Sequence, residues 1–163
     1  MTKGIFGSPR LRGNSEVIVG AVYSKIADAT QDAAQVALFL GGAAVSQVTS
    51  ATDQNINVAK FDSKSFAGFS VCNDHGKRTR TMSVVKVGLN IPVPLATGKT
   101  VAVGDAVGLT ATGSVIKNTD ADCVYLLNAE VTEIGVTALD ANNVAHPNQV
   151  AINLGLGGGV KTP

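Results

Sequence analysis

The chain has 163 residues, of which 45% are hydrophobic and 15% charged, and its formal net charge is +1. This length suits one domain with a single core, and the hydrophobic content excludes a disordered chain. The near-neutral charge gives no sign of nucleic acid, a membrane surface or an acidic substrate as partner. Charged residues make up about a quarter of ordinary domains, so the charged fraction of this chain is low. Two explanations have equal weight. Either partners cover part of the surface, or the chain is simply a β protein rich in small residues.

Glycine and proline are frequent, with 18 Gly and 5 Pro, which favours many turns over long helices. Aromatic residues are only 4% and Trp is absent, which argues against carbohydrate-binding or base-stacking sites. The first ten residues lack the apolar run of a signal peptide. The longest apolar stretch, residues 36–45, contains Gly41 and Gly42 and is shorter than the roughly 20 residues that span a bilayer. We therefore expect synthesis in a cytoplasm and no membrane stage.

The N-terminal third of the chain is the least regular in pattern. Residues 1–15 carry Lys3, Arg10 and Arg12 among glycines, and they predict an irregular arm. Such an arm is either a frayed terminus or a segment that orders on a neighbour. Residues 32–40 are compatible with two turns of helix ended by Gly41, or with a strand that leads into a glycine turn. At most one or two short helices are expected in the whole chain.

From Phe61 onward the pattern is that of β-structure, with valine-rich and threonine-rich runs separated by turn residues. Because proline cannot donate to a ladder, Pro92 and Pro94 indicate that their strand lies at a sheet edge or that its proline positions face away from pairing. Turns that recur about every 8 to 12 residues predict a sandwich or barrel. The expected strands are residues 66–71, 79–87, 90–95, 100–103, the run that begins after the Gly104–Asp105 turn, 125–136 and 149–154.

Three glycines have specific predicted roles. Gly104 and Asp105 lie between two valine-rich runs and predict a tight corner, since Gly tolerates positive φ and Asp bonds its own backbone. Gly68 and Gly88 lie inside strand patterns, where they indicate bulges or a close backbone approach. The predicted organisation is an arm at 1–15, one β-rich domain at 16–155 and a flexible glycine-rich tail at 156–163.

Residues with catalytic or metal-binding chemistry are few. Cys72, Asp74 and His75 form the one local cluster, but three residues in one tight turn do not readily face one ion, so we interpret it as a structural turn. Cys72 and Cys123 are far apart and show no zinc spacing, and whether they pair is open. The second histidine is remote, and the carboxylates are scattered over turns and strands: His146, Asp120, Asp122, Glu130 and Glu133. The sequence therefore predicts no catalytic residue, no metal site and no cofactor.

The run from Phe66 to Thr112 resembles the capsid cement (decoration) proteins of tailed bacteriophages. The similarity lies in the strand at 66–71, the strands over 83–93 and the corner at 101–109, and it extends over about residues 60–155. It implies a small tulip-like or barrel β domain on the outside of an icosahedral capsid, in the virion. Its partners would be the major capsid protein and copies of itself, as a trimer or dimer at symmetric seams. It implies a structural protein and no enzyme, with no nucleic-acid, membrane or small-molecule partner.

Basic residues are the candidate contacts with an acidic rim of the capsid. Three lie in the arm and three at a predicted hairpin tip, which is otherwise an ordinary solvated turn: Lys3, Arg10, Arg12, Lys77, Arg78 and Arg80. Two other functions remain open. One is another structural component of the same particle, such as a tail or head-fibre base protein. The other is an enzyme that uses Cys72 and His75.

Overall fold

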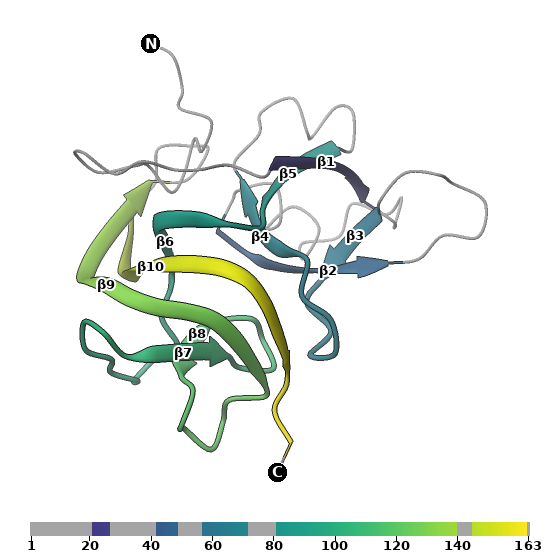
Figure 1. Ribbon diagram of the computed structural model, residues 1–163. Coiled ribbons are helices and arrows are strands. Elements are labelled where there is room, and N and C mark those ends of the chain that lie inside the picture. Colours follow the sequence, from purple (N-terminus) through teal and green to yellow (C-terminus); the bar gives the residue numbers. More distant parts are fainter. Residues whose placement is uncertain (1–20, 27–41, 49–56, 72–80, 140–144, 163) are drawn as a thin grey trace.

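The structure, a computed structural model, describes residues 21–26, 42–48, 57–71, 81–139 and 145–162. These residues form ten strands and include no helix, so the protein is mainly β, as the sequence predicts. The strands, shown in Figure 1, are β1 Ala21–Ile26, β2 Ala44–Val48, β3 Asn57–Lys60, β4 Gly68–Val71, β5 Thr81–Val85, β6 Gly88–Pro94, β7 Ala106–Leu109, β8 Val115–Lys117, β9 Tyr125–Leu139 and β10 Ala145–Val160.

The first five strands form one sheet in the order β1-β3-β2-β4-β5. Strand β5 also pairs with β1, from Ala21 opposite Val85 to Lys25 opposite Thr81, so the pairings of this sheet close on themselves. The pairing of β1 with β3 is parallel, and the other pairings are antiparallel. A small ring of strands needs strong bends, which a tightly placed glycine can provide.

The last five strands form a second sheet in the order β6-β10-β9-β7-β8, with all of its ladders antiparallel. The long strands β9 and β10 curve together through its middle (Figure 1). One parallel bridge, Leu95 with Val115, connects the end of β6 to β8. The described molecule is therefore two sheets, of which only the first has a closed ring of pairings, and it is not one closed barrel.

Both sheets contribute to one apolar core. Phe69 and Val85 enter it from the first sheet, and Val93, Leu109 and Ile152 enter it from the second, all almost completely buried. A group of aromatic rings joins the two sides. The ring of Phe61 meets the ring of Tyr125 edge-to-face with centroids 5.9 Å apart, a favourable arrangement of aromatic pairs.

Several predicted features are confirmed. Strand β6, which carries Pro92 and Pro94, lies at the edge of its sheet, and among the described strands its ladder is with β10. Gly104 has φ 87°, as its place in the corner predicts. Gly68 has φ 146°, and a Cβ there would collide with the carbonyl oxygen of Val85 on the neighbouring strand. The predicted close approach of backbones at Gly68 is therefore real.

Two predictions about strand extent are wrong. Residues 100–103 are not a strand, because the Asp105 carboxylate accepts the Ala102 amide hydrogen at 2.8 Å and folds the segment into a turn. Residues 156–160, predicted as part of a flexible tail, belong to β10, and Gly158–Val160 pair with Tyr125–Leu127. Glycine permits this pairing, because a Cβ at Gly158 would lie 2.6 Å from the carbonyl oxygen of Leu126.

Other predictions fall on residues that the structure does not describe. The arm at 1–15, the helix or strand at 32–40 and the polar turn at 73–78 lie outside the described residues.

Candidate functional site

The residues that the sequence singled out for function are mostly in undescribed segments. All six candidate capsid contacts lie outside the described residues, as does the turn that contains Cys72, Asp74 and His75. The second histidine, His146, and the second cysteine, Cys123, are among the described residues. His146 is exposed on β10, where it pairs with Ala138 of β9. Cys123 is a buried free thiol whose S–H points to the Tyr125 carbonyl oxygen at 3.5 Å, and burial raises its pKa.

The carboxylates are less scattered than the sequence suggests. Asp120 and Asp122 both meet Lys99, whose Nζ lies 3.0 Å from one Asp120 oxygen and 2.7 Å from one Asp122 oxygen. The Asp122 amide donates to Asp120, and together with Lys99 this holds the pKa of Asp120 below its ordinary value. The carboxylates of Asp122 and Asp120 in turn raise the pKa of Lys99, and the bond to Asp122 is the largest cause.

A second ammonium group, that of Lys161, also holds this loop. Lys161 Nζ donates to the carbonyl oxygens of Asn118 at 2.9 Å and Asp120 at 2.7 Å. The loop between β8 and β9 is thus fastened to the end of β10. Sequence reasoning took these carboxylates as scattered and missed the cluster, because only the spacing of Asp120 and Asp122, two residues apart beside a turn, is a local signal for it. Nothing local indicated the partners Lys99 and Lys161. The charges satisfy one another, so the cluster is structural.

The Gly104–Asp105 corner has its own ion pair. Lys117 Nζ lies 2.9 Å from Asp105 Oδ1, while the other carboxylate oxygen accepts the Ala102 amide. Lys117 first and the Ala102 amide second lower the pKa of Asp105. The aspartate therefore fixes the corner both to its own backbone and to β8.

The loop that follows β3 is held by a buried hydroxyl. Ser46 of β2 donates to the Ser65 carbonyl oxygen at 2.6 Å and lies 2.9 Å from Asp62 Oδ1. Desolvation opposes ionisation of Asp62, but the Ser65 and Lys64 amides and the hydroxyls outweigh it, and the pKa of Asp62 is lowered. These contacts set the position of the next residues along the chain, Phe66 and Ala67.

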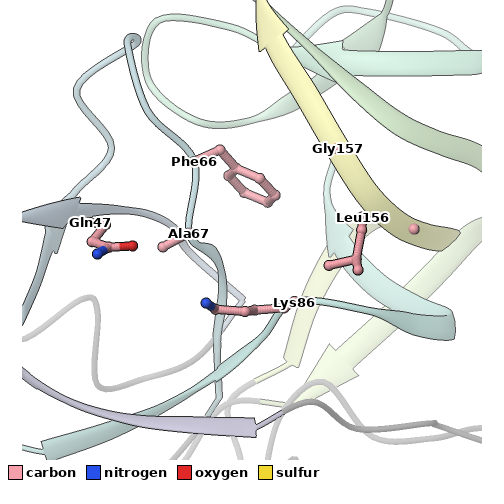
Figure 2. A pocket seen from close by; sticks show the side chains of 7 residues that line it. Gln47, Phe66, Ala67, Lys86, Leu156 and Gly157 are labelled. Atoms are coloured by element: carbon pink, nitrogen blue, oxygen red, sulfur yellow. The ribbon is translucent and has the colours of Figure 1, made fainter. Parts of the chain in front are cut away.

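Phe66 and Ala67 form one wall of a cleft between the two sheets, which has a volume of about 160 Å³. Figure 2 shows Phe66 on one side and the end of β10, with Leu156 and Gly157, on the other. Lys86, which follows β5, and Gln47 complete the lining from the first sheet. The cleft thus combines an aromatic ring, an aliphatic side chain, bare glycine backbone and one cation. Sequence reasoning missed it, because its walls come from four segments that only the fold brings together.

Three exposed apolar residues occur at the same end of the second sheet. Leu126, Leu156 and Val160 are 37%, 71% and 54% exposed, and they lie where the end of β10 pairs with the start of β9. Between Leu154 and Gly158 the register with β9 shifts, and the side-chain amide of Asn128 donates from Nδ2 to the Leu156 carbonyl oxygen at 2.9 Å. This irregularity leaves the Leu156 side chain largely in solvent.

Comparison with protein-family models, with curated proteins and with solved structures gives no match. Within the described ranges, no helix is long and apolar enough to cross a membrane. Across the same ranges, no three His, Cys, Asp or Glu side chains are grouped so as to hold a metal ion. The cleft and the adjoining end of β9 and β10 are thus the candidate functional site.

Proposed function

We propose that this protein is a structural component of a tailed-phage particle, which binds the outside of the capsid and stabilises contacts between major capsid subunits. The observation that carries the proposal is the apolar end of the second sheet. Leu126, Leu156 and Val160 are exposed there, and none of the residues from Gly155 to Val160 is charged. The register of β9 and β10 places Leu126 and Val160 on opposite faces of the sheet, so apolar side chains are exposed on both faces of this end. Exposed apolar surface is typical of interaction sites, whose centres are depleted in charge.

The resemblance found in the sequence supports the same function. The run that carries it, Phe66 to Thr112, includes β4 to β7 together with the Gly104–Asp105 corner, and it forms much of the core between the two sheets. A mainly β fold is also what the resemblance implies. The low charged fraction of 15% fits a surface that neighbours partly cover.

Stabilisation of a capsid needs no chemistry from the bound protein. A standard protein interface buries about 1,200–2,000 Å² in total, and this area must be exposed again when subunits separate. A ligand that binds only the assembled state stabilises that state by mass action. Many copies on a symmetric lattice add their effects through high effective concentration. The proposed partners are the major capsid protein and further copies of this chain, as a trimer or dimer at the capsid surface, with the six basic residues as additional contacts.

The direct test compares particles with and without the protein. Particles that lack it should assemble but should release their genome at a lower temperature, and the added protein should restore resistance in proportion to its occupancy. The double variant Cys72→Ala/His75→Ala should restore it equally well. Particles that are equally heat-resistant without the protein would contradict the proposal. A double variant that binds without restoring resistance would favour an enzyme.

A matched pair of variants tests the proposed surface. Leu156→Asp places a charge in the apolar end of the second sheet and should reduce particle occupancy at least about tenfold, which corresponds to 1.4 kcal/mol. Ile134→Asp makes the same change at another exposed position of β9, far along the strand from Leu126, and should leave occupancy unchanged. Equal loss in both variants would remove this surface from the proposal. Electron microscopy that locates the protein in the tail or at a fibre base would favour the other structural role.

A further inference from the structure

The last part of β10 is held differently from the rest of the strand. Up to Leu154, β10 lies between β9 and β6, and its buried side chains, Ile152 among them, enter the core. The register with β9 then breaks, and the ladder resumes at Gly158 opposite Leu127. Residues 158–161 are therefore a separate short piece of strand, which we call the end segment.

The end segment is held by backbone groups and one ammonium group, and it brings no buried apolar side chain. Its two glycines have no side chain, and Val160 is 54% exposed. The Lys161 amide donates to the Val124 carbonyl oxygen at 2.8 Å, and Lys161 Nζ donates to two carbonyl oxygens of the loop between β8 and β9. Such bonds give a small net stabilisation, because water offers similar bonds to a released chain. The end segment thus opens at lower cost than the rest of β10.

The connection that precedes the end segment contains surplus chain. Four residue steps from Leu154 to Gly158 face only two steps along β9. Two extra steps of extended chain correspond to about 7 Å. The connection includes Gly157, whose φ is 100°, and glycine changes its backbone conformation at little steric cost. By straightening, the connection can therefore carry the end segment away from its own β9.

The place that the end segment occupies is selective for this segment. A Cβ at Gly158 would lie 2.6 Å from the Leu126 carbonyl oxygen and 3.0 Å from the Tyr125 ring, so glycine is needed there. Three positions later, two loop carbonyl oxygens accept from Lys161 Nζ at 2.9 and 2.7 Å. Among the lysines of the sequence, only Lys161 has glycine three positions before it. The occupant that fits is this segment, from the same chain or from a second copy.

We propose that copies of this protein exchange the end segment, so that residues 158–161 of one copy pair with residues 125–127 of a second copy. Exchange of an identical element forms in the second copy the contacts that it breaks in the first, which makes it a low-cost way to join copies. The surplus chain at 155–157 bridges the two copies. The exchanged strand rebuilds the same end of the second sheet, so the inference goes beyond the proposed capsid role and does not depend on it.

The test is disulfide trapping between two variants of the full chain that carry tags of different mass. Both contain Cys72→Ser. One also contains Leu126→Cys and the other Gly159→Cys, at positions that are direct partners on β9 and β10. Direct cross-strand partners lie within the Cα separation that a disulfide needs. After joint refolding and mild oxidation, we expect a disulfide between the two differently tagged chains, in an amount that rises with protein concentration. Mass spectrometry of tryptic peptides identifies the joined positions.

A second pair of variants is the matched control. Glu130→Cys and Asn153→Cys also replace direct partners on β9 and β10, but they lie before the surplus chain. This part of β10 is anchored in the core, so the control pair should give no disulfide between chains. Far-UV circular dichroism verifies that each variant folds.

Two further variants test the mechanism of exchange. A single chain with both Leu126→Cys and Gly159→Cys, oxidised while dilute, should keep the end segment on its own β9 and should not join to another copy. Gly158→Ala, added to the Gly159→Cys variant, should remove most of the disulfide between chains, because the added Cβ meets the backbone of Leu126.

Three outcomes would overturn the inference. One is a disulfide between chains that is no more abundant than in the control pair, because the copies then join through another surface or stay apart. Another is an oxidised double-cysteine chain that still joins other copies. The third is an undiminished disulfide in the Gly158→Ala variant, which would contradict the proposed register. None of these outcomes bears on the particle test, because binding to a capsid through exposed apolar residues needs no exchange.

Discussion

Gly104 and Gly68 need glycine for different reasons, and the difference predicts a ranking of substitutions. Gly104 has φ 87° but open space around its missing Cβ, so alanine there costs only backbone strain of about 1–2 kcal/mol. Gly68 has φ 146° and the Val85 carbonyl oxygen in the way, so alanine there must also displace a neighbouring strand. We expect Gly68→Ala to lower the free energy of unfolding more than Gly104→Ala, as measured by urea denaturation.

Gly159 supplies the control, because it has neither a positive φ nor any atom near its Cβ position. Gly159→Ala should change the free energy of unfolding little, or raise it slightly, since alanine reduces the freedom of the unfolded chain. Gly104→Val should cost at least as much as Gly104→Ala, because a β-branched residue tolerates positive φ poorly. Equal effects at the three glycines would show that their conformations do not determine stability.

At the scale of elements, the loop from Lys117 to Cys123 predicts a pH dependence. The pKa of Asp120 is lowered, first by the Asp122 amide and then by Lys99, and the pKa of Asp105 is lowered, first by Lys117. A carboxyl with a lower pKa in the folded state stabilises the fold above its unfolded pKa of about 3.9. This contribution to stability is lost as the pH falls through the pKa that the carboxyl group has in the folded state. Lys99 behaves oppositely, since its raised pKa contributes stability that is lost only in alkali, above about pH 10.

The expected result is a urea midpoint that is steady near neutral pH and falls below about pH 4. Asp120→Asn should lower the midpoint at pH 7 and reduce the decline in acid, because the variant has no proton to take up at that position. Glu130→Gln, a change of the same kind on β9 at a carboxylate that receives a hydrogen bond of 3.4 Å from Asn153, serves as the comparison. If Asp120→Asn and the wild type declined in parallel, the contacts of Asp120 would contribute nothing to the acid response.

The sequence predicted the elements better than it predicted the site, and the reason is physical. Strand character and turns depend on local chemistry, so the corner at Gly104 and the edge position of Pro92 could be inferred from neighbours in the chain. The glycines at the end of β10 resemble a linker in composition, and only the complementary edge of β9 makes them a strand. Likewise Lys86 and Leu156 are 70 positions apart, 156 minus 86, and nothing in either segment indicates that they share a cleft.

At the scale of the whole molecule, the shared core predicts a single cooperative unfolding transition. Phe69 of β4 and Leu109 of β7 belong to different sheets, but both are almost fully buried in the same apolar cluster. The edge-to-face contacts of Phe61 and Phe66 with their neighbours lie at the same junction. Neither sheet can therefore lose its structure without exposing apolar surface of the other.

Substitution in either sheet should consequently shift the same transition. We expect Leu109→Ala to lower the free energy of unfolding by about 2–5 kcal/mol and Phe69→Ala by about 3–5 kcal/mol, as for other large-to-small changes in cores. In each variant the unfolding curves from far-UV circular dichroism and from tyrosine fluorescence should coincide, as they do for a two-state domain. Two separate transitions, with Phe69→Ala affecting only one and Leu109→Ala only the other, would show that the sheets fold independently. In that case the cleft between them would be a junction of two units, and its geometry would depend on how they dock and no longer on the core they share.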